Sequence, residues 1–144
     1  MKRLYLLPLA IGLTFSLPAL AAPAKTRAAA CPSQQFPAFF AAFSDNVALQ
    51  KAFTAFPLAH VMLDHAVQPE PRKVSKQLPQ AKLSFPLMPP KAVRTKQGLA
   101  FRVDQETDKN AKVTLFKEDT GYQVAYFFRK DACWKLERRE DLSM

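Results

Sequence analysis

The chain has 144 residues, of which 49% are hydrophobic and 23% charged, a balance typical of a folded globular protein rather than a disordered one. Its 21 basic residues outnumber 12 acidic ones, so the formal net charge of +9 favours anionic partners. The sequence contains no serine nucleophile elbow, no His-Glu-x-x-His motif and no glycine-rich phosphate loop, so it predicts no catalytic residues and no cofactor.

Residues 1–21 are predicted to be a cleavable secretory signal. Lys2 and Arg3 precede an apolar run that ends in the small-residue pattern Ala19-Leu20-Ala21, which is typical of a signal peptidase site. Proline and glycine interrupt the run, which is also shorter than the roughly 20 residues that span a bilayer. We therefore expect cleavage after Ala21, a periplasmic or secreted protein, and no transmembrane segment in the mature chain.

An alternative signal is the segment Ala28–Cys31, which resembles the box that precedes a lipidated bacterial cysteine. Lys25 and Arg27 separate it from the apolar run, which disfavours lipidation. Cleavage after Ala21 leaves 123 residues with 19 basic and 12 acidic side chains, a net charge of +7. The expected partner is a protein or an anionic component of the envelope, because nucleic acid lies in another compartment.

The mature chain keeps two cysteines, Cys31 near its beginning and Cys133 near its end. Disulfides form and persist outside the cytoplasm, so we expect these two residues to be bonded. Two buried free thiols are the alternative. A catalytic thiol is disfavoured because neither cysteine has a histidine close in sequence.

Residues 22–30 are predicted to be a flexible leader, followed by a single domain over residues 31–144. Ser33 is a candidate helix cap, and an aromatic stripe at helical spacing follows it. A second helix is expected after Ser44-Asp45-Asn46, with Pro57 ending it. The positions at i, i+3, i+4 and i+7 are Phe36, Phe39, Phe40 and Phe43 in the first helix and Leu49, Ala52, Phe53 and Phe56 in the second.

The middle of the chain carries a weaker pattern. Residues 58–67 are mostly apolar and could form a strand, although strong β-formers are few. Residues 68–98 contain six prolines among lysines and glutamines, which predicts a wrapped loop with a short helix between Arg72 and Leu83.

From Leu99 onward apolar residues recur with a period of two, which predicts a four-stranded antiparallel meander. Glu118–Gly121 is a predicted hairpin turn in which Gly121 supplies the positive φ, and Lys130–Ala132 is a second tight connection. The run Glu137–Asp141 is interpreted as a solvated strand end. Together with the helices, this gives an α+β domain in which two aromatic helices pack on a curved antiparallel sheet.

The aromatic positions Phe39, Phe40 and Phe43, the tripeptide Phe56-Pro57-Leu58 and the strand Cys133–Leu136 resemble a bacterial family of exported proteins of unknown function. That family has the cone fold named after nuclear transport factor two. The resemblance implies helices packed against a strongly curved sheet that can enclose a cavity. It implies no catalytic residues.

The apolar row of the predicted third strand should face the helical phenylalanines, with any cavity at the open end of the sheet. The candidate pocket residues are Tyr122, Tyr126, Phe128 and Trp134. A catalytic interpretation would use Asp104 with Tyr122 or Tyr126, but tyrosines at alternating apolar positions are more often core residues. His60, Asp64 and His65 are the only metal-like group, and they fall short of a metal site.

Three functions remain open on the sequence. The favoured one is a non-enzymatic envelope protein that binds a partner or ligand through its cone. The second is an immunity or inhibitor protein that blocks a toxin or a wall-cutting enzyme. The third is a small hydrolase or isomerase, for which a carboxylate of raised pKa in a deep pocket would be the sign.

Overall fold

The computed structural model describes residues 28–144. The predicted signal, its cleavage site and most of the predicted leader lie outside the described residues. Ala28, Ala29 and Ala30 are exposed and form no regular element. Among residues 28–144, no helix combines the length and the apolar character needed to cross a membrane.

Two short helices begin the fold. Helix α1 spans Phe36–Asp45 and α2 spans Val47–Ala52. Asn46 lies between them and caps α2, because its side chain accepts hydrogen bonds from Ala48 N and Leu49 N. The predicted stop and restart is therefore confirmed. Ser33 is not the cap of α1: the helix is preceded by Gln35, whose N–H donates to Ser33 Oγ at 3.0 Å.

The predicted second helix is too long. It ends at Ala52, and the chain turns directly into β1, Thr54–Asp64, so that Phe56 and Pro57 belong to a strand. The strand begins early because Thr54 pairs with Leu136 of the last strand, while Leu136 N donates to Phe53 O at 2.9 Å. Tertiary pairing thus overrides the local helical pattern.

The predicted loop over residues 68–98 contains two regular elements. Strand β2, Arg72–Leu78, pairs with β1 where a short helix was expected, and α3 spans Lys91–Gln97. A 3₁₀ turn at Gln80–Lys82 lies between them. The sequence missed β2 because most of its side chains are exposed and polar on both faces, so no period of two is visible.

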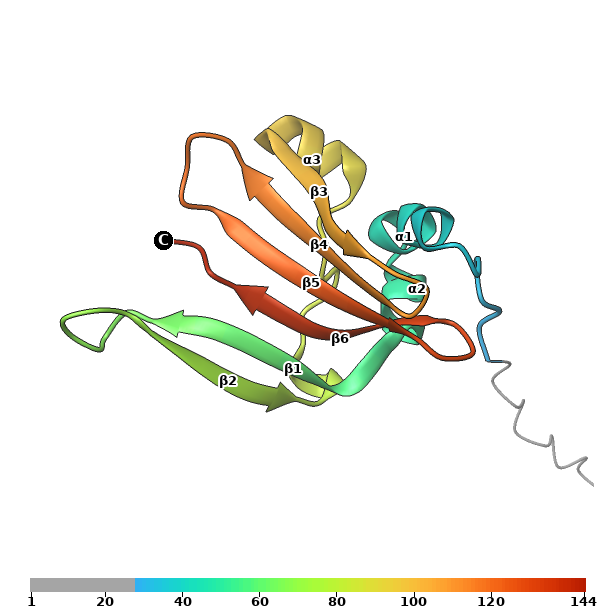
Figure 1. The fold of residues 1–144 in the computed structure, drawn as a ribbon, viewed down its shortest axis with the longest axis horizontal. Coiled ribbons are helices and arrows are strands. Elements are labelled where there is room, and N and C mark those ends of the chain that lie inside the picture. The colour runs from blue at the N-terminus through green and yellow to red at the C-terminus, as the bar shows by residue number, and fades with distance from the viewer. Residues whose placement is uncertain (1–27) are drawn as a thin grey trace, which may run out of the picture.

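The remaining strands are β3 (Leu99–Glu106), β4 (Asn110–Lys117), β5 (Gln123–Lys130) and β6 (Trp134–Asp141). They form the predicted antiparallel meander, which is part of a six-stranded sheet of order β2-β1-β6-β5-β4-β3 (Figure 1). Because β1 runs parallel to β6, the sheet is mixed rather than wholly antiparallel. The α+β class is confirmed.

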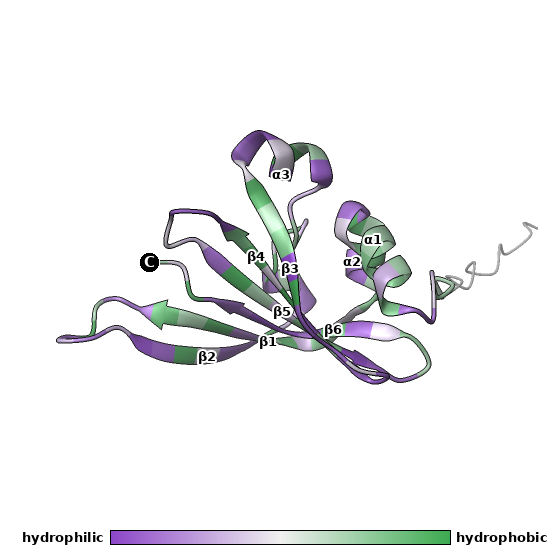
Figure 2. Ribbon diagram, turned by 45° about the horizontal axis from the view of Figure 1, so that its top comes forward, coloured by the Kyte–Doolittle hydropathy of each residue, from purple (hydrophilic) through white to green (hydrophobic). Residues whose placement is uncertain are grey.

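One face of the sheet, here called the inner face, packs against the helices. Phe128 contacts Phe36, Phe39 and Phe43 edge-on, with ring centroids 5.3–6.1 Å apart. Apolar residues colour α1 and several strands in Figure 2, whereas β2 and β6 are mostly hydrophilic. Helices α1 and α2 lie near one end of the strands, while the β1–β2 hairpin and the C-terminus extend away from them (Figure 1).

The segment between β2 and α3 also packs on this core. Gln50 is almost fully buried, and its side-chain carbonyl accepts hydrogen bonds from Leu87 N at 2.7 Å and Met88 N at 3.1 Å. Its amide donates to Ser44 O and Met88 O. Gln50 therefore holds the irregular stretch around Leu87 and Met88 against α1 and α2.

The β4–β5 turn differs from expectation in one detail. Asp119, not Gly121, has the positive φ, 55°. A Cβ on residue 121 would lie 2.6 Å from Met144 O, so the glycine permits close approach of the C-terminal segment instead.

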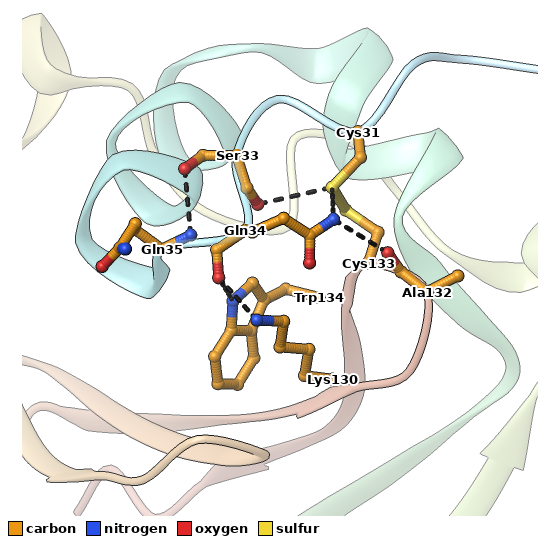
Figure 3. Close-up of a disulfide and its surroundings, with 8 residues drawn as sticks. All are labelled: Cys31, Ser33, Gln34, Gln35, Lys130, Ala132, Cys133 and Trp134. Carbon is orange, nitrogen blue, oxygen red and sulfur yellow. Dashed lines mark hydrogen bonds between the residues drawn. A yellow bond between two sulfur atoms is a disulfide. The ribbon is translucent and has the colours of Figure 1, made fainter.

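Cys31 and Cys133 are bonded, and they join the segment before α1 to the β5–β6 connection (Figure 3). Gln34 reinforces this junction: its amide donates to Ala132 O at 3.0 Å, and its backbone carbonyl accepts from Trp134 Nε1 at 3.1 Å and Lys130 Nζ at 2.8 Å. The start of the domain is thus held to its last hairpin by one covalent and three polar contacts.

Candidate functional site

A row of polar side chains crosses the inner face beyond the helices. The strand registers place Lys76 opposite His60, His60 opposite Arg139, and Arg139 opposite Tyr126. Four neighbouring strands, β2, β1, β6 and β5, each contribute one member, so the four side chains lie side by side. We call them the polar row.

Arg139 is the centre of the polar row. Its guanidinium lies 3.1 Å from an Asp141 carboxylate oxygen and 3.4 Å from His60 Nδ1. Since a guanidinium can only donate, Nδ1 accepts the contact and the proton of a neutral imidazole resides on Nε2. The Arg139 side chain keeps 23% of its exposure, so it is fixed by partners but still open to solvent.

The electrostatics of the row follow from burial. Desolvation is the main cause that lowers the pKa of His60 below 6.5, and the adjacent Arg139 charge lowers it further. Burial also raises the pKa of Tyr126 to about 12, and its hydroxyl donates to Leu87 O at 3.0 Å. At neutral pH, His60 and Tyr126 are therefore uncharged polar groups in a row that also holds the cations Arg139 and Lys76.

Two cavities lie on the inner face beyond the polar row, and the smaller one includes Lys76 of the row. One of about 440 Å³ lies between the start of β3, the β4–β5 turn and the C-terminal segment, and the other, about 240 Å³, lies on the β1–β2 hairpin. The larger falls in the range of roughly 300–1,000 Å³ that is common for small-molecule sites. Leu99, Lys117, Tyr122 and Ser143 are among its lining residues; Met62, Val74 and Lys76 line the smaller one.

The structure separates the predicted pocket residues. Tyr126, Phe128 and Trp134 are fully buried beneath the helices and the segment around Leu87, where they form core. Tyr122 lines the larger inner-face cavity, whereas Trp134 reaches only a separate hollow beside Gln34 and Lys130. Tyr122 lies near Asp141, and burial, followed by that carboxylate, raises its pKa.

Asp104, the carboxylate of the catalytic interpretation, lies on the outer face. It accepts from Arg102 Nε at 2.7 Å and from the Thr114 hydroxyl, and Lys112 is 3.4 Å away. Burial tends to raise its pKa, but the hydrogen bonds from Thr114 and Arg102 outweigh it and the net pKa is lowered. The sheet therefore separates Asp104 from Tyr122 and Tyr126, which face inward.

The two histidines of the metal-like group lie in different surroundings. His60 is buried in the polar row, whereas His65 is exposed beyond the end of β1. Within residues 28–144, no three histidine, cysteine or carboxylate side chains come close enough to hold a metal ion.

Sequence reasoning missed Arg139 and Asp141 because of a β-bulge. Simple alternation from Trp134 and Leu136 would turn Arg138 and Glu140 inward, but the register shifts between Phe127 and Phe128, which skips Glu137. Arg138 consequently stacks over the Phe127 ring on the outer face, 3.7 Å from its centroid. The run Glu137–Asp141 is thus only partly exposed and contributes to the inner face, which corrects its interpretation as a solvated strand end.

The fold is similar to a solved structure, that of an NTF2-like protein from Bacteroides fragilis. The two chains share 21% sequence identity with a TM-score of 0.53, over 76% of this chain and 47% of the other. This chain thus spans about half the length of that neighbour. The likeness supports the NTF2-like cone fold.

No protein-family model matches the chain. No curated protein matches it either. Function must therefore be inferred from the polar row and its cavities.

Proposed function

We propose that the protein is an exported, non-enzymatic binding protein of the cell envelope that holds a small ligand at the open end of its inner face. The observation that carries this proposal is the polar row beside two inner-face cavities, with the partly exposed Arg139 side chain at its centre. Clefts lined by apolar residues with a few converging polar groups are typical ligand sites.

Export is supported by the predicted signal and by the disulfide. A bond between Cys31 and Cys133 persists in an oxidising compartment and is rare in a reducing one. The resemblance to an exported family of unknown function agrees with this location. We place the mature protein, beginning at Ala22, in the periplasm or outside the cell.

Binding is favoured over catalysis by the state of the acidic and phenolic groups. Asp104 is on the outer face, and Asp141 is paired with Arg139. The Tyr126 hydroxyl is buried and already donates to Leu87 O. Asp104, Asp141 and the Tyr126 hydroxyl are therefore engaged in holding the fold or the polar row, which leaves Tyr122 at the larger cavity without a paired carboxylate from this set.

The proposal is tested by two-dimensional NMR spectra of the mature protein, titrated with a library of small anionic, cationic and neutral fragments. We expect amide shifts at Tyr122, His60 and Arg139 for at least one chemical class. Tyr122→Ala should weaken these shifts, whereas Phe127→Ala, an equally half-buried aromatic on the outer face, should not. Shifts confined to the outer face, or none with any fragment, would contradict the proposal.

A further inference from the structure

The open end of the inner face carries an excess of positive charge. Lys76 and Arg139 belong to the polar row, and Lys117 lines the larger cavity. Two carboxylates lie on this face, Asp141 beside Arg139 and Asp64 in the smaller cavity with Lys76, so three cations face two anions. His60 adds no charge, because burial and the Arg139 guanidinium lower its pKa. The cluster therefore attracts an anion.

Arg139 has the geometry to receive that anion directly. Asp141 lies beside one end of its guanidinium and His60 beside another, so the side chain is oriented without a ligand. A guanidinium has five N–H donors, more than these two contacts occupy. A pre-oriented, partly exposed cation loses little conformational entropy on binding.

The surroundings of the cluster are partly apolar. Leu99 and Tyr122 line the larger cavity, and Met62 and Val74 line the smaller one. Lys76 of the polar row lines the smaller cavity, and the charges of Arg139 and Asp141 act on Tyr122, which lines the larger one, so a ligand whose head reaches Arg139 can place its body on these side chains. Neither a purely inorganic anion nor a purely apolar molecule would use both features.

Resting on the proposed binding function, we infer that the ligand is a small organic anion: a carboxylate or phosphate head that binds Arg139, joined to a short apolar body that lies against Tyr122 and Leu99. Lys76 and Lys117 contribute longer-range attraction. Charge-assisted hydrogen bonds to the head would fix its orientation.

The test compares three eight-carbon probes that share one apolar body: octanoate, octyl phosphate and octanol, each below its micelle concentration. Titration calorimetry and NMR on the mature protein should show at least one anion binding about ten- to a hundredfold more tightly than octanol. Arg139→Gln should remove this preference. Arg138→Gln is the matched control, because the neighbouring arginine faces outward over Phe127, and it should retain the preference.

Arg139→Gln could also disturb the fold, because it removes the partner of Asp141 and His60. Lys117→Gln, an exposed substitution at the cavity wall, gives a second reading: it should weaken anion binding a few-fold and leave octanol binding unchanged. Octanol binding as tightly as both anions would overturn the ligand class but leave the binding function standing. An absence of inner-face shifts with all three probes would overturn this ligand class, while the fragment titration separately tests the binding function.

Discussion

Arg139 lies beside His60 on the inner face, its Nη1 atom 3.4 Å from Nδ1 of a ring that is only 5% exposed. The contact requires a neutral imidazole, because an imidazolium has no acceptor to offer the guanidinium. It therefore makes protonation of His60 unfavourable in the folded protein.

Stability should consequently fall as the pH drops below neutral. The folded-state pKa of His60 is lowered, first by burial and then by Arg139, while the unfolded value is near 6.5. The unfolded chain therefore binds the proton more readily than the folded protein does. The stabilisation from neutral His60 is complete above pH 6.5 and is lost as the pH falls through the folded pKa. The free energy of unfolding should fall by at most about 1.4 kcal/mol per pH unit in this window. Urea melts between pH 7.5 and 5 measure this loss.

Carboxylates also titrate towards the lower end of that range, so the comparison needs variants. His60→Gln should flatten the dependence between pH 7 and 5.5. His65→Gln is the matched control, because its ring is exposed, and it should leave the dependence unchanged. Equal pH profiles for all three proteins would show that His60 is not the responsible group.

Gln50 should be among the most sensitive polar positions. Gln50→Ala leaves Leu87 N and Met88 N buried without their acceptor, which costs about 1–3 kcal/mol for each unsatisfied group. We expect a loss of roughly 2–5 kcal/mol in denaturant melts. Gln123→Ala, which removes an exposed amide, should change the free energy of unfolding by less than about 0.5 kcal/mol. A loss that small for Gln50→Ala would mean that water replaces its contacts.

The sequence predicted the parts of the fold whose patterns are local and apolar. The phenylalanine spacing in α1 and the alternation in β5 both arise because one face of each element is buried, so these periods predict the elements directly. Strand β2 is an edge strand whose side chains are mostly exposed, so its sequence shows no apolar period and does not predict it. The extension of β1 back to Thr54 depends on pairing with Leu136, far away in sequence.

Most of the candidate site could not be predicted from the sequence, for two physical reasons. Arg139 and His60 are 79 residues apart and meet only because β1 pairs with β6. The bulge opposite Phe127 then exchanges which arginine faces inward. Tyr122 was predicted for the pocket and does line a cavity, whereas its neighbours Tyr126 and Phe128 are covered by the helices and the Leu87 segment.

The aromatic core gives a third prediction. Phe43 and Trp134 are almost completely buried, so Phe43→Ala and Trp134→Ala should each cost roughly 3–5 kcal/mol through cavity formation. Lys135→Ala and Arg129→Ala are exposed neighbours, and the Arg129 contacts to Asp131 and Glu137 are surface ion pairs of little weight. Thermal melts of all four variants separate the two classes. A stable Trp134→Ala protein would contradict the packing described here.

The mass of the intact exported protein tests how its N-terminus is processed. We expect the envelope form to begin at Ala22 and to carry no lipid, because Lys25 and Arg27 separate the apolar run from Cys31. Ala21→Asp, which places a charge at the predicted cleavage site, should cause the uncleaved precursor to accumulate. A mass that includes diacylglycerol on Cys31 would instead identify a membrane-tethered lipoprotein.

The disulfide should stabilise the protein chiefly through the unfolded chain. It closes a loop of 102 residues, for which the chain-entropy estimate is about 4.7 kcal/mol, and measured values are commonly about 2–4 kcal/mol. In the folded protein, Gln34 separately holds the same junction through Ala132, Lys130 and Trp134.

The double variant Cys31→Ser, Cys133→Ser should therefore lose about 2–4 kcal/mol in urea melts and show a larger m-value, since its unfolded chain is less compact. Its Trp134 indole N–H resonance should stay near the parent position, which reports that the native junction survives. Unchanged stability, or native cysteines that alkylate freely without reduction, would show that the bond does not fulfil this role.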